Sequence, residues 1–306
     1  MSNLRTFMYH DIRDNKDTKF PDRYNLKSFL SLEEFEFQLK HISENYDIVS
    51  PEDIKFINFS HDTGHRFAIL TFDDGLADHY NNVLPLLKKY NIPGTFFIPV
   101  EQVTKNTMIH SHKIQFILAA SDEKELVKDI LSNFKDNETI WPHFSYTKWK
   151  DNWWSKEMIF VTNFLRNYDG FVLDKYEYTD QLFEKYVGMK VSDFAKGFYL
   201  SEDQVDKMRK EPLVTIGGHG YTSENLLLID DFEDDIKKCA EFVKSEFISY
   251  PNGGYNEEIK KACKKYGFNI GFTVEQKTIT ELDLIDDLEM PRYDAPQKLP
   301  LKNILV

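Results

Sequence analysis

The chain has 306 residues, 41% of them hydrophobic, so it can bury a sizeable core in one large α/β domain or in two smaller ones. Its formal net charge of −13 argues against a nucleic-acid-binding surface and against adsorption to an anionic membrane. Cys239 and Cys263 provide neither a disulfide framework nor a paired-cysteine zinc motif, and we expect two buried free thiols. With no apolar stretch of membrane-spanning length and no secretory signal pattern, we expect a soluble, cytoplasmic protein whose oligomeric state stays open.

The first third of the chain predicts a βαβ unit. LRTFMYHDI is apolar and aromatic enough for a buried strand, which runs into a polar loop over residues 11–30. Ser31 and Glu34 have the spacing of a capping box that begins the amphipathic helix LEEFEFQLKHISENY. Residues 67–72 then predict an apolar strand, followed by an acidic turn, a helix over about 77–90 and the strand TFFIPV. Such a unit requires a parallel sheet covered by helices.

The middle of the chain is different. Residues 105–200 are aromatic and helix-like without a βα rhythm, and we predict a helical insertion within a single domain of residues 1–306. After it the rhythm returns, with a helix capped by Ser201 and with strands in PLVTIGGHG, FISYPNGG and FNIGFTV. Repeated βα units predict a barrel or a doubly wound sheet, and in both folds the loops at the carboxyl ends of the strands carry the chemistry.

Two adjacent carboxylates, Asp73 and Asp74, stand where the strand AILTF ends. Adjacent carboxylates near a buried strand are costly unless a cation or a shared proton compensates them. Because neighbouring residues point in different directions, one can bind a metal while the other faces the reacting water as a general base. The pair alone is equally compatible with a helix cap, since carboxylates favour helix N-termini.

TFDDG on a strand end, followed by a helix and PGTFFIPV, resembles the first motif of the polysaccharide deacetylases, carbohydrate esterase family four. IGGHGYTSENL and SYPNGGYNEEI follow in the order of its second and third motifs. The resemblance implies a distorted (β/α) barrel, hydrolysis of an N- or O-acyl group on a sugar, and a divalent metal, usually zinc. It also implies that Asp73 is the general base and that Asp74 binds the metal.

His219 ends the strand LVTIGG and, by the same resemblance, is a metal ligand. The sequence departs from the family pattern four residues later, where Ser223 and then Glu224 stand in place of a second histidine. Serine is a poor zinc ligand, so Glu224, His10 at the end of the first strand, or His112 in the insertion are the candidates for completing the site. The alternative is a metal that is weakly bound or absent. The remaining histidines of the barrel part have no comparable context, and we expect them to face solvent: His41, His61, His65 and His79.

SYPNGGY resembles the third motif, in which the residue after the proline donates its backbone N–H to the developing oxyanion. Here that donor is Asn252, beside Pro251 and two flexible glycines. A β-turn that caps the following helix is the alternative. Tyr250 and Tyr255 are expected to line the substrate pocket. By the same resemblance, Arg292 and Asp294 in MPRYD are expected to contact substrate or to tune the base, and a buried salt bridge would explain them equally well.

These features predict a metal-dependent, zinc-binding deacylase that removes an acetyl group from a sugar. We expect a nucleotide- or lipid-linked sugar of bacterial surface-polysaccharide synthesis, with the aromatic insertion as a wall of its site or simply as core. Ser223 favours a different class, a degenerate deacetylase domain that binds carbohydrate without catalysis. Hydrolysis of a non-sugar amide is a third possibility.

Overall fold

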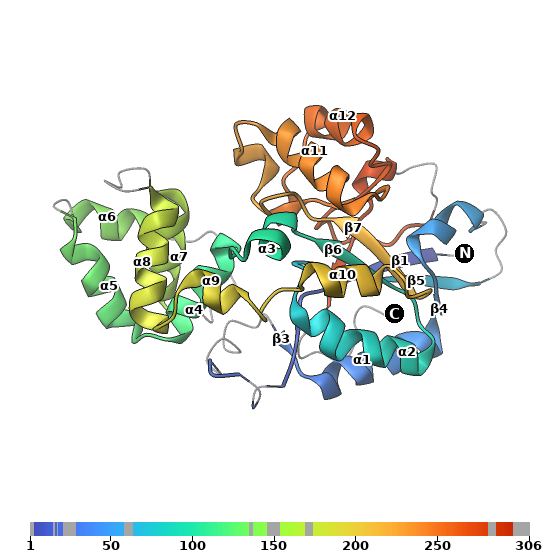
Figure 1. Ribbon diagram of the computed structural model, residues 1–306, viewed down its shortest axis with the longest axis horizontal. Coiled ribbons are helices and arrows are strands. Elements are labelled where there is room, and N and C mark those ends of the chain that lie inside the picture. The colour runs from blue at the N-terminus through green and yellow to red at the C-terminus, as the bar shows by residue number, and fades with distance from the viewer. Residues whose placement is uncertain are drawn as a thin grey trace. The chain divides into compact units, whose positions relative to one another are not determined.

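The structure, a computed structural model, describes residues 3–14, 16, 18–20, 29–57, 64–134, 137–145, 154–168, 174–280 and 286–295. The chain divides into two compact units (Figure 1). Unit 1 comprises Met1–Asp14, Phe29–Thr107 and Ala195–Val306, and unit 2 comprises Asn15–Ser28 and Met108–Phe194. Unit 2 takes in most of the insertion expected at about 105–200, together with an earlier segment that the sequence did not assign to it. The single domain of residues 1–306 stays a prediction.

Unit 1 is built on a parallel sheet with the strand order β10-β1-β5-β6-β7-β8-β9, in which β4 also pairs with β5. These strands are β1 Asn3–Tyr9, β4 Asp47–Ile48, β5 Arg66–Phe72, β6 Gly94–Ile98, β7 Val214–Gly218, β8 Phe247–Ser249, β9 Ile270–Phe272 and β10 Tyr293–Asp294. A small parallel sheet joins β2 (Asp11–Ile12) to β3 (Phe29–Leu30). The curled parallel sheet with its helices confirms the distorted (β/α) barrel that the sequence predicts.

The register brings the carboxyl ends of the strands to one edge. Tyr9 of β1 lies opposite Phe72 of β5, and Gly218 of β7 lies opposite both Ile98 of β6 and Ile248 of β8. The residues that directly follow these strands therefore share one edge of the sheet, which is where parallel α/β folds place their sites.

Helices cover the sheet of unit 1: α1 Leu32–Asn45, α2 Leu84–Tyr90, α3 Val100–Lys105, α10 Glu202–Met208, α11 Phe232–Val243 and α12 Glu257–Lys265. The predicted capping box is present, because Ser31 Oγ accepts a hydrogen bond from the Glu34 N–H while the Glu34 carboxylate accepts one from the Ser31 N–H. Ser201 caps α10 as predicted. Buried side chains such as Phe35 of α1 and Ile236 of α11 pack into one core with the strands, and each such side chain contributes about 1.5–3 kcal/mol.

The helix predicted over about 77–90 is present, with one departure from α-helical geometry. Residues His79–Val83 form a π-helical turn before the helix continues as α2. Both predicted free thiols are confirmed as buried, Cys239 on α11 and Cys263 on α12.

Unit 2 is helical, with α4 His110–Ala119, α5 Glu123–Ser132, α6 Asn137–Phe144, α7 Lys156–Asn167, α8 Lys175–Val187 and α9 Val191–Ala195. Its aromatic side chains form core, since Phe160 and Phe164 are buried and stack at 5.3 Å between ring centroids. None of the helices in the described part of the chain is long and apolar enough to span a membrane.

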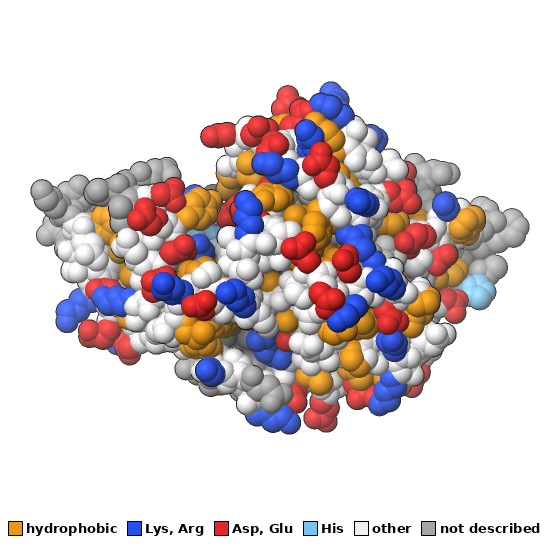
Figure 2. Space-filling model, viewed as in Figure 1, with side chains coloured by type: hydrophobic (Ala, Val, Ile, Leu, Met, Phe, Trp, Pro, Cys, Tyr) orange, Lys and Arg blue, Asp and Glu red, His pale blue; other side chains and the backbone are white. Residues whose placement is uncertain are grey.

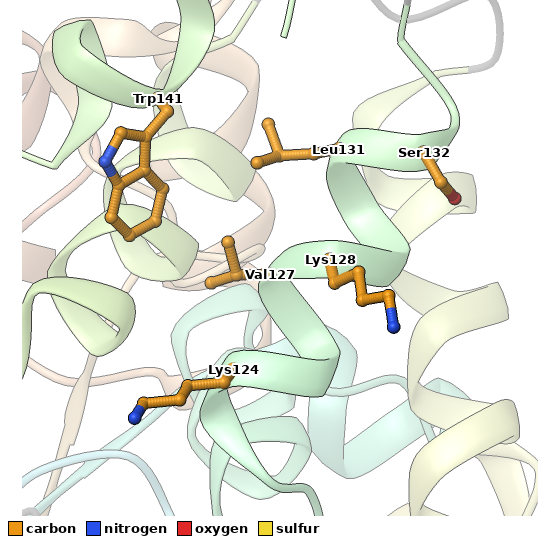
Figure 3. A pocket seen from close by; sticks show the side chains of 6 residues that line it. All are labelled: Lys124, Val127, Lys128, Leu131, Ser132 and Trp141. Carbon is orange, nitrogen blue, oxygen red and sulfur yellow. The ribbon is translucent and has the colours of Figure 1, made fainter. Parts of the chain in front are cut away.

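A groove of about 520 Å³ lies on unit 2, lined by Lys124, Val127, Lys128, Leu131, Ser132 and Trp141. Val127 and Leu131 of α5 point toward the indole of Trp141, whereas the ammonium group of Lys128 points away from it (Figure 3). The polar groups of this groove do not converge on one point, so it offers no arrangement for chemistry.

Candidate active site

The sequence-predicted residues of unit 1 follow neighbouring strands at the carboxyl edge of the sheet. Asp73 and Asp74 follow β5, His10 follows β1, and His219 follows β7. The loop that begins at Tyr250 follows β8. Figure 2 shows acidic and basic side chains interspersed over one face of the molecule, so charge alone does not mark a site on that face. The site is therefore defined by the contacts among these residues.

Asp73 forms a buried ion pair with Arg292. Its carboxylate accepts a bidentate pair of hydrogen bonds from Arg292, Nη1 to Oδ1 and Nη2 to Oδ2, each at 2.8 Å. Ser249 Oγ donates a third bond to Oδ2 at 3.2 Å. The side chain of Arg292 is 0% exposed and that of Asp73 is 3% exposed. A bidentate guanidinium–carboxylate pair fixes the plane of the carboxylate as well as its charge.

The pKa of Asp73 is set by two opposing effects. Burial raises it, but the charge of Arg292, the charge of His219 and the hydrogen bonds from Arg292 outweigh burial, and the pKa lies below its usual value. Asp73 is therefore ionised at neutral pH, as a general base must be. Three of its roughly four lone-pair positions are occupied, which leaves one for a water molecule.

Arg292 itself is anchored on three sides. Nε donates to the Thr273 carbonyl at 2.9 Å, Nη1 to Thr71 Oγ1 at 3.2 Å and Nη2 to Ser249 Oγ at 2.8 Å. Its contacts are those of a buried salt bridge, the alternative to contact with substrate. None of its side chain is exposed, so Arg292 holds Asp73 from within the protein.

Asp74 and His219 form a second pair. Asp74 has a left-handed backbone, with φ of 72°, and its Oδ1 lies 3.4 Å from Nε2 of His219. The other ring nitrogen, Nδ1, lies 3.0 Å from the Ser249 carbonyl oxygen. Since a carbonyl only accepts, Nδ1 carries a proton, and when the ring is neutral Nε2 presents a lone pair toward the carboxylate.

Two acceptors that face each other at this distance fit a bound cation. The two ligand atoms of a tetrahedral zinc ion, each about 2.0–2.2 Å from the metal, lie roughly 3.3–3.6 Å apart. The hydrogen bond from Nδ1 to a backbone carbonyl is the kind of contact that usually fixes the ring of a metal-binding histidine. Among the described residues, however, no group of three or more His, Cys, Asp or Glu side chains could hold a metal, so neither His10 nor Glu224 completes a three-residue set. The third ligand stays a prediction.

The loop that carries His219 is fixed by Asp235 of α11. The Asp235 carboxylate accepts hydrogen bonds from Tyr221 N at 2.7 Å, from Thr222 N at 2.9 Å and from Thr222 Oγ1 at 2.7 Å. Ser223, where the family pattern has histidine, is buried in this loop with φ of 62°. Sequence reasoning missed Asp235, although an acidic residue in the first turn of the following helix is a signal for such a cap.

We expect Asp235→Asn to lower the free energy of unfolding by about 1.5–3 kcal/mol. The reason is that the amide nitrogen of asparagine donates, so it cannot accept a hydrogen bond from a backbone N–H of the loop. Chemical denaturation measures the change. Asp234→Asn is the matched control, since Asp234 is the neighbouring carboxylate on the same helix and is exposed to solvent with Lys238 as its partner; its effect should stay within about 0.5 kcal/mol. Equal effects of the two substitutions would contradict the role given to Asp235.

His10 is half-buried directly after β1. Burial lowers the pKa of its imidazole, but the negative charges of Asp74, Asp73 and Asp294 together outweigh burial and raise it. His10 is thus electrostatically coupled to both aspartates, and Asp294, exposed on β10, acts on the same ring. Whether His10 binds a metal stays a prediction. His112 is a buried residue of α4 in unit 2, and its role as a ligand also stays a prediction.

One prediction about the histidines was wrong. His79 was expected to face solvent, but it is fully buried in the π-helical turn. His65 is exposed and His41 is partly exposed, whereas His61 lies outside the described residues. A helix that begins at a sheet edge must turn one side of its first turn toward the sheet, and His79 lies on that side, against Phe72 and Phe96.

The third loop presents a backbone donor. Asn252 has a left-handed backbone, with φ of 52°, and within the described part of the chain its N–H makes no hydrogen bond, which suits it to receive an oxyanion. Tyr250 is 1% exposed, donates its hydroxyl to the Leu288 carbonyl and stacks on Tyr255 at 4.9 Å. Tyr250 and Pro251 are thus buried, whereas Tyr255 is partly exposed, and its contact with substrate stays a prediction.

Parallel strands, an ion-paired Asp73 and an Asp74–His219 pair define an α/β protein with a cluster of ionisable residues at the carboxyl edge of its sheet. The family described as polysaccharide deacetylase matches residues 60–138, which include β5, both aspartates and β6. The resemblance inferred from the sequence is therefore confirmed.

Individual proteins show the same resemblance. The chain is 28% identical over 97 residues to the "Putative polysaccharide deacetylase YxkH" of Bacillus subtilis (strain 168), a match that spans 31% of the chain and 31% of that protein. Among solved structures, the deacetylase PplD of Streptococcus pyogenes in complex with acetate has a TM-score of 0.57 at 14% identity, covering 99% of this chain and 96% of the other. A de-N-acetylase of Aggregatibacter actinomycetemcomitans has a TM-score of 0.57 at 15% identity, covering 99% and 98%. At this level of identity the structures establish the fold alone.

Proposed function

We propose that the chain is a metal-dependent hydrolase that removes an N-acetyl group from a sugar. The observation that carries the proposal is the pairing of an ionised, buried Asp73 with the facing acceptors of Asp74 and His219. The family match supports a deacetylase, and the solved relatives include a de-N-acetylase and a deacetylase with bound acetate.

In the proposed reaction Asp73 takes a proton from the attacking water, which then adds to the amide carbonyl. The Asn252 N–H donates a hydrogen bond to the oxyanion that forms. A divalent ion, which Asp74 and His219 would bind, supplies Lewis-acid activation of water and of the carbonyl. Arg292 keeps Asp73 ionised until it takes that proton and holds the plane of its carboxyl group throughout, and a proton then goes to the leaving amine.

The test is release of acetate from three kinds of substrate with added Zn²⁺: N-acetylglucosamine oligosaccharides, nucleotide- or lipid-linked N-acetyl sugars, and simple acetamides. Activity on either sugar class supports the proposal, and preference for the linked sugars supports the narrower substrate class. Activity on the acetamides alone would replace the sugar with a small amide. Absence of activity on all three, with sugar binding retained, would favour a non-catalytic carbohydrate-binding domain, for which the incomplete set of metal ligands among the described residues is the supporting observation.

We expect Asp74→Ala to lose both tightly bound metal and at least about 10³-fold in activity, because one of two facing ligands and the activation of water disappear together. Elemental analysis of protein purified without chelator measures the metal. His65→Ala is the control, since His65 is an exposed imidazole beside Asn3, at the amino end of β1. Full activity of Asp74→Ala without metal would contradict metal dependence.

A further inference from the structure

His79 is a buried titratable residue to which the proposed reaction gives no part. Its imidazole is 0% exposed and lies beside the rings of Phe72 and Phe96, each 5.7 Å away between centroids. Burial lowers its pKa to about 4, so the ring is neutral at neutral pH. A phenyl ring would fill the same apolar surroundings without the cost of burying polar nitrogens. The presence of histidine therefore calls for a polar reason.

That reason is a bond to the backbone of His10. Nε2 of His79 lies 3.0 Å from the His10 carbonyl oxygen, and because a carbonyl only accepts, Nε2 is the donor. The other nitrogen, Nδ1, is buried and has no hydrogen-bond partner among the described residues. His79 thus tolerates an unsatisfied atom on one side of the ring in order to make a single bond on the other.

The same turn makes two further contacts with the segment after β1. Asn82 Nδ2 donates to the Ile12 carbonyl at 2.8 Å. Arg13 Nε donates to Oδ2 of Asp78, the residue before the turn, at 2.6 Å. His10–Arg13 is therefore attached by side chains at three points to one short stretch of chain. This stretch is π-helical, a conformation that is rare and occurs frequently at functional sites.

We propose that His79 is a positioning residue that fixes His10 at the carboxyl edge of the sheet, beside Asp73 and Asp74. The neutral imidazole donates to the His10 carbonyl and so sets where the chain leaves β1 and where the His10 side chain points. This role rests on the proposed function only in that His10 takes part in the site. The turn that follows Asp74 thereby links the acidic motif to the first strand.

Two substitutions distinguish the effect of the hydrogen-bond donor of His79 from the effect of its side-chain volume. His79→Phe fills the space beside the stacked rings of Phe72 and Phe96 but cannot donate a hydrogen bond, whereas His79→Gln keeps an N–H group at about the same reach. We expect kcat/KM for acetate release to fall roughly 10- to 100-fold in His79→Phe, as for other residues that orient an active-site group. His79→Gln should recover most of that loss. Equal losses in both variants at unchanged thermal stability would overturn the donor role.

If the proposal holds, the loss of activity in His79→Phe must also depend on the presence of the His10 side chain. We expect His79→Phe to cause little further loss when added to His10→Ala, because the group it orients is already gone. A loss of full size in the double variant would contradict the proposal. Asn82→Ala is the matched control, since it removes a neighbouring bond from the same turn to Ile12 and should lower activity less than His79→Phe does.

Crystal structures of the wild type and of His79→Phe decide the question without any activity. A shifted His10 carbonyl and imidazole in the variant supports the proposal even if no deacetylase activity is found, in which case only the proposed function fails. An unmoved His10 overturns the proposal whether or not the enzyme is active.

Discussion

Asp73→Asn is expected to lower kcat for acetate release by roughly 10²–10⁴-fold, the usual contribution of a general base. Asparagine has nearly the same shape as aspartate, but its amide cannot accept a proton from water. Loss of the charge also weakens the pair with Arg292, so activity must be measured at a temperature at which circular dichroism shows the variant folded. Asp47→Asn is the control, because Asp47 is an exposed carboxylate that pairs with His65. More than about a tenth of wild-type activity in Asp73→Asn would exclude Asp73 as the base.

The assignment of base and ligand between the two aspartates follows from their partners. Asp73 is bonded to a guanidinium that satisfies its charge, so it needs no metal to stay ionised. The Oδ1 of Asp74 faces the lone pair of a histidine, an arrangement that a cation stabilises. From the Asp-Asp-Gly sequence alone, the base and the metal ligand could not be assigned to one aspartate or the other. The residues that each aspartate contacts in the folded chain make that assignment.

Local patterns predicted much of the barrel. The capping box at Ser31, the cap at Ser201 and the strand before Asp73 depend on interactions within a few residues, and all three are present. The convergence of Asp73, Asp74 and His219 was also predictable, because parallel strands bring their carboxyl ends to one edge whatever the loops between them. These are the features for which short-range chemistry and topology are sufficient.

Contacts between distant segments were not predictable. Arg292 reaches Asp73 across 219 residues of sequence, and nothing in MPRYD says which carboxylate it pairs with. His79 was misplaced because its neighbours in sequence do not show that the first turn of its helix packs on the sheet, against Phe72 and Phe96. Tyr250 was expected in the pocket wall, but its hydroxyl finds a partner in Leu288, again a contact that only the folded chain creates.

Arg292→Met is expected to lower the free energy of unfolding by about 3–5 kcal/mol, because it leaves Asp73 as a buried charge without its partner. It should also reduce activity, since the plane of the base is no longer fixed. The free energy of unfolding of Arg292→Lys should lie between those of the wild type and of Arg292→Met, because a lysine cannot make the bidentate pair. Urea denaturation gives the free energies, with Arg66→Met, an exposed arginine at the start of β5, as a control expected within about 0.5 kcal/mol.

A double-mutant cycle and a pH series show whether that loss belongs to the pair. If it does, Asp73→Asn and Arg292→Met combined should destabilise the protein by about 2–3 kcal/mol less than the sum of the single changes.

Because the pKa of Asp73 is lowered in the folded protein, the pair contributes stability above the unfolded pKa and loses it as the pH falls through the folded pKa. In Arg292→Met, protonation of Asp73 removes the cost of the unpaired buried charge. The difference in unfolding free energy between wild type and Arg292→Met should therefore be full at neutral pH and shrink toward about pH 4 and below. A difference that is constant with pH, or single effects that simply add, would assign the loss to packing around Arg292 and not to its charge.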